Sequence, residues 1–293
     1  MTQPRRFGIG EWYGRSFVGL TRDERRNYAA GTGSQPCPFR MGGGSCTKTG
    51  GVCSFRLYED HDGVAVPAPD AESGLRVLCP RRFEEEMTIF QWVGEVVLGT
   101  TTPAIVTEVG FLKAEDGNTH VGRIDMVLAS QESGTGVLNW CALEIQAVYF
   151  SGRSMSEEFS NIRNYEGEQP PFPGQIRRPD YRSSGPKRLM PQLQIKVPTL
   201  RRWGKKMAVV VDKHFYDSLG RMEEVGDLSS GDIAWFTVDF VEHDQTTPGK
   251  RFKLVRDRVH VTTLERATEG LTGGFPVTLT EFEEGIRSKL VGR

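Results

Sequence analysis

The sequence lacks a long apolar run, a dense cysteine framework and an excess of charge of one sign. No stretch of the 293 residues approaches the roughly 18 apolar residues that a membrane helix needs, and the first residues contain no continuous apolar segment. We therefore expect no membrane span, no secretory signal and a cytoplasmic location, where the five cysteines are reduced thiols or metal ligands. The net charge of −1 neither indicates nor excludes a polyanionic partner, so the distribution of charge has to decide.

The chain does contain enough apolar material for a folded core, at 37% hydrophobic and 26% charged residues. Residues 29–54 are rich in Gly and Cys, and this composition predicts an irregular loop that needs an organiser. A helix that ends near Gly99 is indicated further along, because apolar side chains recur there at helical spacing, namely Phe83, Met87, Phe90 and Val97.

Strands and two further helices are predicted after this point. Strand-like runs occupy 104–112, 121–129, 137–150, 207–212, 232–241 and 251–264, and the second and third are joined by a hairpin connection. A helix is indicated between the third and fourth runs by Leu189, Leu193, Val197 and Leu200. At the end of the chain, Thr280 and Glu283 predict a capping box for a helix with an apolar stripe of Phe282, Ile286 and Leu290. The order of elements predicts a mixed α/β fold around one central sheet with flanking helices.

Acidic side chains interrupt three of the predicted strands. Glu144 and Gln146 are two positions apart and share a strand face, so the buried carboxylate needs a compensating hydrogen bond, cation or metal. If the hairpin forms, Asp125 approaches Glu144, and Glu108 on the preceding strand is a candidate third acid. Two close carboxylates favour a cation between them, and Mg²⁺ prefers such hard oxygen ligands. The alternative is a pair of surface acids on a half-exposed sheet.

Four cysteines lie in the first third of the chain. Cys37, Cys46, Cys53 and Cys79 are separated by eight, six and twenty-five residues, so there is no CxxC pair, and small buried thiols are common in cores. Three of the four lie in Gly-rich loops with little core of their own, which four thiolates around one tetrahedral metal would hold together. The ligand set alone does not choose between zinc and iron. Cys141, on a predicted strand, is expected to be an ordinary core residue.

Basic residues are concentrated between Pro170 and Lys206, a range that contains ten Lys or Arg residues and a single acidic residue, Asp180. Charge runs are commonly solvated faces, but those tend to mix both signs. We expect a loop in this region to grip phosphates and read bases in a major groove, since Arg is a frequent bidentate partner of guanine. The candidate DNA-binding residues are Arg177, Arg178, Arg182, Lys187 and Arg188.

Several distinctive blocks lie between about Trp12 and about residue 216 and read, in order, CPF, SCTKTGGVCS, VLCPRRF, VGRID, LEIQAVYFSG and RRPDYRSSGPKR. These blocks, in this order, resemble the NotI-like type II restriction endonucleases of the PD-(D/E)XK superfamily. The resemblance implies a PD-(D/E)XK nuclease core over 81–293 and, over 1–80, a metal-binding region with four cysteine ligands. It also implies a homodimer that cleaves both strands of a GC-rich palindrome with Mg²⁺, in a bacterial cytoplasm where a companion methyltransferase protects the same site.

Carried over to this chain, the resemblance makes Asp125 and Glu144 the Mg²⁺ ligands and Glu108 an upstream acid. Gln146 stands where the superfamily has a lysine, and an amide can neither act as a base nor carry charge. Iron at the four cysteines is implied, with zinc as the alternative. Gln146 leaves room for a second interpretation, a non-catalytic sequence-specific DNA-binding protein in which the cysteine site and the basic segment are used and the acids are remnants.

Overall fold

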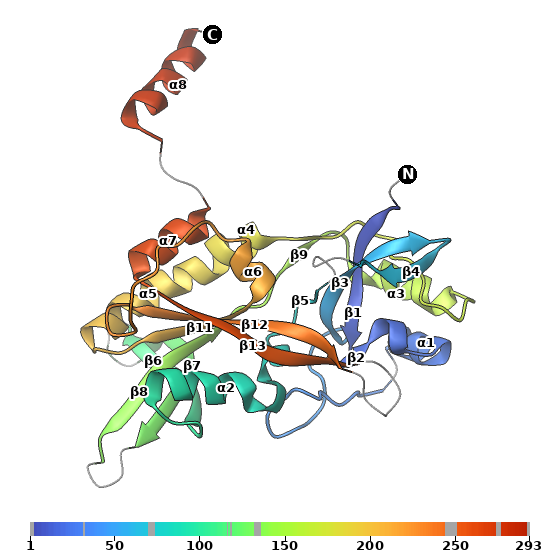
Figure 1. Cartoon of the computed structure of the whole chain (residues 1–293), viewed down its shortest axis with the longest axis horizontal. Coiled ribbons are helices and arrows are strands. Elements are labelled where there is room, and N and C mark those ends of the chain that lie inside the picture. The colour runs from blue at the N-terminus through green and yellow to red at the C-terminus, as the bar shows by residue number, and fades with distance from the viewer. Residues whose placement is uncertain are drawn as a thin grey trace.

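The computed structural model describes residues 3–31, 33–69, 74–115, 117, 119–131, 136–243, 251–273 and 277–291. Two sheets organise these residues, a six-stranded sheet in the middle and C-terminal parts of the chain and a five-stranded sheet near the N-terminus. Figure 1 shows the N-terminal sheet at one end of the molecule and the six-stranded sheet, with helices on its two faces, at the other.

The six-stranded sheet has the order β13-β12-β11-β8-β7-β6. Its strands are β6 (Ala104–Lys113), β7 (His120–Gln131), β8 (Leu138–Ile145), β11 (Met207–Asp212), β12 (Ile233–His243) and β13 (Arg251–Thr262). Strand β11 pairs in parallel with β8 and β12, and the remaining pairs are antiparallel. All six residues of β11 are buried, as is usual for a central parallel strand. The predicted strands and the mixed α/β class are thereby confirmed.

Helices cover both faces of this sheet, and alternating side chains of β11 show the two cores. Ala208 and Val210 pack toward α2 (Thr88–Val93), whereas Val209 and Val211 pack toward α5 (Met190–Arg202) and α7 (Leu264–Thr272). The face with α5 also carries α4 (Tyr181–Ser184), the π-helical turn η5 (Gly185–Leu189) and α6 (Lys213–Asp217). Figure 1 shows this layer across the sheet from α2.

The spacing of apolar residues predicts where the helices lie, but it does not predict where a helix is interrupted. Leu189, Leu193, Val197 and Leu200 are all buried in the core beneath α5, as expected. The helix expected over 83–97 is instead a 3₁₀ segment η3 (Pro80–Met87), α2 and a π-helical turn η4 (Gly94–Leu98). The break lies at Glu86 and Met87, whose φ angles are +52° and +62°. Gly99 ends the segment in the left-handed conformation, as predicted.

The N-terminal sheet was not predicted from the sequence. It contains β1 (Arg5–Trp12), β2 (Arg15–Ser16), β3 (Val52–His61), β4 (Val64–Pro67) and β5 (Arg76–Val77). The 3₁₀ turn η1 (Phe17–Gly19) and helix α1 (Arg22–Ala30) connect β2 to the Cys-bearing loop.

A segment from the middle of the chain completes the N-terminal core. Helix α3 (Met155–Asn164) places Phe159 against Trp12, with ring centroids 5.3 Å apart and planes 15° apart, and buries Ile162 in the same core. The short strands β9 (Phe150–Ser151) and β10 (Arg178–Pro179) pair on either side of this insertion.

Helix α8 (Leu279–Val291) stands apart from the rest of the molecule in Figure 1. Its capping box is made by Thr278 and Glu281, two residues earlier than the expected pair, because Thr278 and Glu281 exchange both backbone-to-side-chain hydrogen bonds. Phe282 is exposed, and so are Ile286 and Leu290 of the same stripe. Within the described residues, none of the helices combines the length and the hydropathy that crossing a bilayer requires.

Candidate functional site

The hairpin of β7 and β8 brings two acidic residues together. Met126 pairs with Leu143 in this antiparallel register, at the end of the paired segment. Asp125 precedes Met126 and Glu144 follows Leu143, so these two residues lie opposite each other. Their side chains differ in environment, because Asp125 is 54% exposed and Glu144 is almost fully buried. The approach of the two carboxylates that the hairpin predicts is present in the structure.

A lysine on helix α5 reaches both of these acids. Lys196 Nζ lies 2.8 Å from Glu144 Oε2 and 3.4 Å from Asp125 Oδ2, and the lysine side chain is 2% exposed. In the sequence, Lys196 reads only as part of the basic segment. A signal was available, since Lys196 lies between Leu193 and Val197 on the buried face of the predicted helix, and a buried lysine needs an acidic partner.

The charge balance of this cluster follows from its burial. Burial raises the pKa of Glu144, and the nearby Asp125 carboxylate raises it further, while Lys196 acts in the opposite direction. The ammonium group of Lys196 is therefore the cation that compensates the buried carboxylate.

Gln146 follows directly after the end of β8. Its backbone N–H donates to Val210 O of β11 at 3.0 Å, and its side-chain Nε2 donates to Ala147 O at 2.6 Å. The residue is buried and lies on the wall of a cavity of about 370 Å³ together with Glu144. The amide nitrogen is thus directed at the backbone rather than at the two acids.

Basic and aromatic side chains also line this cavity. Arg188 lies over the ring of Tyr149, 3.6 Å from its centroid, and donates to the Tyr149 hydroxyl at 2.8 Å. Lys187 and Gln192 line the same cavity. A carboxylate and exposed positive charge thus line the same concave surface.

Glu108 joins the acids from the neighbouring strand. Thr107 pairs with Met126 and Val109 with Ile124, so Glu108 lies opposite Asp125 between these two pairs. Its φ of +58° is rare for a residue other than Gly, Asn or Asp, and such strain is concentrated at functional sites. Glu108 is exposed, with one carboxylate oxygen 3.6 Å from Arg123 Nη1.

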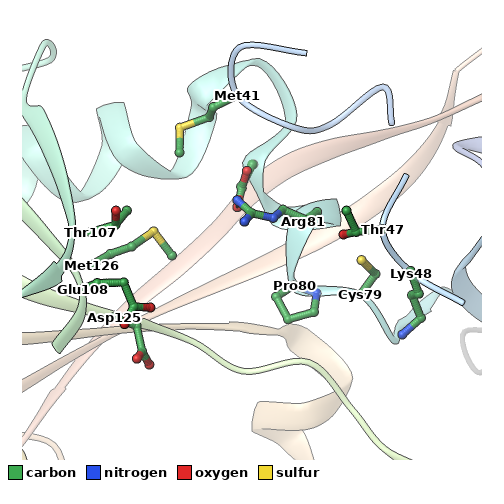
Figure 2. Close-up of a pocket in the computed structure, with 11 residues that line it drawn as sticks. Met41, Thr47, Lys48, Cys79, Pro80, Arg81, Thr107, Glu108, Asp125 and Met126 are labelled. Atoms are coloured by element: carbon green, nitrogen blue, oxygen red, sulfur yellow. The ribbon is translucent and has the colours of Figure 1, made fainter. Parts of the chain in front are cut away.

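Glu108 and Asp125 line a second cavity, of about 540 Å³. Figure 2 shows the two carboxylates on one wall of it and Arg81, Lys48 and Cys79 on the opposite wall. The acids therefore lie between two concave surfaces that both carry positive charge.

Backbone hydrogen bonds bring the four N-terminal cysteines together in two pairs. Cys37 N donates to Gly44 O and Cys46 N donates to Gln35 O, on either side of a β-bridge, while Cys79 N donates to Cys53 O. Burial raises the pKa of Cys79, and the neighbouring Cys37 and Cys46 raise it further, so the two pairs lie within electrostatic reach of each other.

The five cysteines, all of which lie in the described residues, form no disulfide with one another. Among the residues that the structure describes, no three His, Cys, Asp or Glu side chains are arranged closely enough to bind one metal ion together. The backbone places the cysteines side by side, but their sulfur atoms do not form a ready tetrahedral set. Cys141 is fully buried in the core of the central sheet, where an ordinary core residue was expected.

The loop that we expected within the basic segment, ahead of the predicted helix, contains short regular elements. Residues 178–202 fold mainly into β10, α4, η5 and α5, on which Arg178, Arg182, Lys187 and Arg188 are exposed. Arg177 differs from them, because it is 6% exposed, packs over Phe55 and donates to the carbonyls of Arg153 and Ser154. In this conformation Arg177 is an internal structural residue rather than a surface contact.

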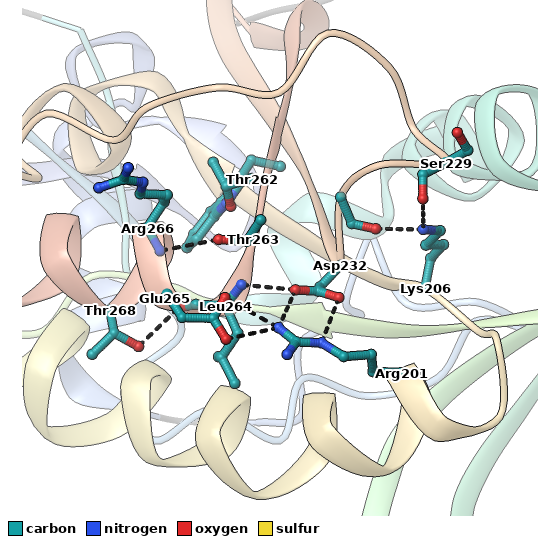
Figure 3. A network of polar contacts seen from close by, with 12 residues as sticks. Arg201, Lys206, Ser229, Asp232, Thr262, Thr263, Leu264, Glu265, Arg266 and Thr268 are labelled. Carbon is teal, nitrogen blue, oxygen red and sulfur yellow. Dashed lines mark hydrogen bonds and ion pairs between the residues drawn. The ribbon is translucent and has the colours of Figure 1, made fainter.

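Part of the remaining positive charge is also used within the fold, as Figure 3 shows. Arg201 binds Asp232 and Glu265, which ties the end of α5 to the start of α7. Lys206 donates to Ser229 O at 2.9 Å. These two cations are engaged by internal partners and are poorly placed for a ligand.

Comparison with known proteins gives one family. The family model described as restriction endonuclease NotI matches residues 26–254. This range includes the four N-terminal cysteines, the three acids, Lys196 and the basic segment. No curated protein matches the chain significantly.

Proposed function

The chain belongs to the restriction endonuclease NotI family, and from this premise we propose that it is a type II restriction endonuclease that uses Mg²⁺ to cleave both strands of a GC-rich palindromic DNA site. The observation that carries the proposal is the pairing of Asp125 and Glu144 across β7 and β8, next to concave surfaces with exposed basic side chains. Hydrolysis of a phosphodiester needs such acids where an anionic substrate can reach them.

The acids fit the catalytic metal that this function requires. Mg²⁺ is commonly held by one or two carboxylates while water and substrate phosphate complete its shell. Asp125 and Glu144 provide two carboxylates, of which Asp125 is open to solvent, and we assign them as the ligands. Glu108 is assigned as an upstream acid at the same edge. When bound, the metal would supply an activated water and neutralise charge on the phosphodiester.

The chain's own side chains bind and orient the substrate in this proposal. Arg81 and Lys48 face the acids across one cavity, and Lys187 and Arg188 line the other, so both flanks of the acids can bind phosphates. Gln146 cannot act as a base, and its amide nitrogen is bonded to Ala147 O, so its assigned role is to orient the attacking water through the amide oxygen.

We assign a structural metal, iron with zinc as the alternative, to Cys37, Cys46, Cys53 and Cys79. Support comes from the two backbone-paired sets of cysteines and from the absence of regular structure between α1 and β3, apart from one β-bridge, in the described residues of that segment. Bringing four sulfur atoms onto one ion would fix these loops against the sheet.

The remaining assignments follow from the family and from symmetry. A palindrome cut on both strands is most simply recognised by a two-fold homodimer with one cleavage site for each strand. Exposed arginines of the basic segment suit guanine, whose O6 and N7 accept two hydrogen bonds from one guanidinium group. A bacterial cytoplasm, with a companion methyltransferase that protects the same site, completes the proposal.

A plasmid assay tests the proposed function. Supercoiled DNA incubated with the wild-type protein and Mg²⁺ should give discrete linear fragments, and EDTA should prevent cleavage. Asp125→Asn should bind DNA but not cleave it, because the substitution removes a ligand charge from an exposed position without leaving a buried lysine unpaired. Specific DNA binding without cleavage by the wild type would instead support the non-catalytic DNA-binding interpretation.

A further inference from the structure

Lys196 contacts both of the proposed metal ligands, Asp125 and Glu144, but has no role in the proposed function above. We infer, building on that function, that Lys196 is a positioning residue of the cleavage site, which holds the carboxylates of Glu144 and Asp125 together and supplies positive charge beside them from helix α5. Its ammonium group contacts both carboxylates, and its aliphatic stem lies in the apolar stripe beneath the helix.

Stability alone does not explain this arrangement. A buried ion pair loses the hydration of both charges, and replacing such a pair by apolar residues of similar size is often neutral or stabilising. Position 196 lies next to Val197 on the buried face of α5, where a methionine or leucine would continue the apolar stripe. A charged pair at this point is therefore explained better by a requirement of the site than by a requirement of the fold.

The charge cannot come from the strand that carries Glu144. Position 146 shares a strand face with Glu144, but Gln146 is uncharged and its amide nitrogen is bonded to Ala147 O. Helix α5 packs on one face of the sheet, and Lys196 reaches Glu144 and Asp125 from this helix. A lysine placed at position 146 would start from the same face and could reach the same acids.

A fixed cation has two effects at this place. It sets the direction of the Glu144 and Asp125 side chains before substrate arrives, and misplacement of reacting groups by about 1 Å costs on the order of 100-fold in rate. It also lies in a water-poor environment, where a preorganised charge acts more strongly on the negative charge of a phosphodiester transition state than it would in water.

The test compares Lys196→Met, Lys196→Arg, Lys196→Gln and the double exchange of Lys196→Gln with Gln146→Lys, against the wild type and Lys289→Met. The control removes one positive charge from exposed α8, far from the acids. For each protein we would measure kcat and KM with Mg²⁺, DNA affinity with Ca²⁺ in place of Mg²⁺, and the melting temperature with and without each metal.

We expect Lys196→Met to lower kcat by about 100-fold while KM and DNA affinity change by no more than a few-fold. Lys196→Arg should retain more of the rate than Lys196→Met, and the exchange variant should recover cleavage relative to Lys196→Gln alone. Recovery by the exchange cannot be produced by a purely structural role of position 196, and it remains informative if Lys196→Met folds poorly.

Two results overturn the inference and can be told apart. Cleavage by the wild type together with an unchanged kcat in Lys196→Met, or with no recovery in a folded exchange variant, overturns the role of Lys196 alone. A folded wild-type protein that binds DNA and does not cleave it with Mg²⁺ overturns the proposed function and this inference together.

Discussion

Arg82 Nε donates to Glu11 Oε2 at 2.8 Å, and both side chains are completely buried. Glu11 belongs to β1 of the N-terminal sheet, whereas Arg82 also donates to Glu85 at 2.9 Å and to Phe252 O of β13 at 3.0 Å. This one guanidinium group therefore joins the N-terminal sheet to the central sheet. The joint matters for function because the Cys-bearing loop and the acids lie on opposite walls of one cavity.

Removal of Arg82 should cost far more stability than removal of a surface arginine. Arg82→Met leaves Glu11 and Glu85 buried without their cation, and breaking a buried pair in this way costs about 3–5 kcal/mol. Arg5→Met is the control, because Arg5 pairs with Glu59 at a side-chain exposure of 40%, and such pairs contribute about 0–1 kcal/mol. Urea unfolding of both variants measures the loss of unfolding free energy. A similar loss in the two variants would contradict the role of Arg82 in connecting the two sheets.

The four N-terminal cysteines should behave differently from Cys141. If they hold one structural metal, elemental analysis should find about one Fe or Zn per chain that dialysis against EDTA hardly removes. Replacing any of the four by Ser should release the metal and lower the melting temperature, because metal binding and folding are coupled.

Cys141→Ala provides the matched control for these serine variants. Cys141 is buried in the core of the central sheet, so its replacement should leave the metal content unchanged. A wild-type chain that is soluble and natively folded without metal would contradict the assignment of the four cysteines as ligands of a structural metal.

Asp212 gives the stability of the chain a pH dependence of known sign. Burial raises its pKa from the ordinary value of 3.8 to about 6, and within the described structure its Oδ2 has no hydrogen-bond partner, although Oδ1 accepts from Phe215 N. Between these two pH values the folded chain keeps a proton that the unfolded chain has released. The contribution of Asp212 to stability therefore falls as pH rises from about 4 to about 6.

Asp212→Asn isolates this contribution, because the amide oxygen can still cap α6. The free energy of unfolding of the variant relative to wild type should rise with pH, by roughly 2–3 kcal/mol between pH 4 and pH 7, as expected for a shift of about two pKa units. Urea unfolding across this pH range measures the difference. A constant difference would show that the two states bind the Asp212 proton equally well.

The strands of the central sheet could be predicted because they alternate or bury apolar side chains, and the Asp125–Glu144 pair followed from the hairpin between two of them. Strand β1 was missed, since its sequence RRFGIGEW mixes charged residues and Gly with apolar ones, and the buried Glu11 is matched by Arg82 from elsewhere in the chain. For the same reason, Lys196 was counted only as one of the ten basic residues between Pro170 and Lys206. A sequence shows a charged residue, but its partner is fixed by packing between distant elements.

Arg177 shows the same limit within the basic segment. It reads as one more surface arginine in the sequence, yet its side chain is enclosed by Phe55 and by the carbonyls before α3. We expect Arg177→Ala to lower the melting temperature, because it leaves those carbonyls without their donor.

Sequence preference should depend on the exposed arginines of this segment. Arg178 and Arg182 are exposed and lie before α5, and we propose that they contact base edges in a major groove. A bidentate contact between Arg and guanine is worth about 1–3 kcal/mol of discrimination, so Arg178→Ala or Arg182→Ala should reduce the ratio of specific to non-specific binding by about 5-fold to about 150-fold. Competition binding at fixed salt, on the cognate duplex and on single-substituted duplexes, measures this ratio.

Lys205→Ala is the comparison variant, because a lysine that binds phosphate adds affinity without reading sequence. Lys205 lies near the C-terminal end of the basic segment, with its Nζ 5.6 Å from the ring centroid of Trp140. Its loss should weaken binding to all duplexes alike and reduce the salt dependence. Arg178→Ala and Arg182→Ala should instead change the order in which duplexes are bound. If both arginine variants keep the wild-type preference and lose only overall affinity, they bind the DNA backbone, and the residues that read the bases lie elsewhere on the chain.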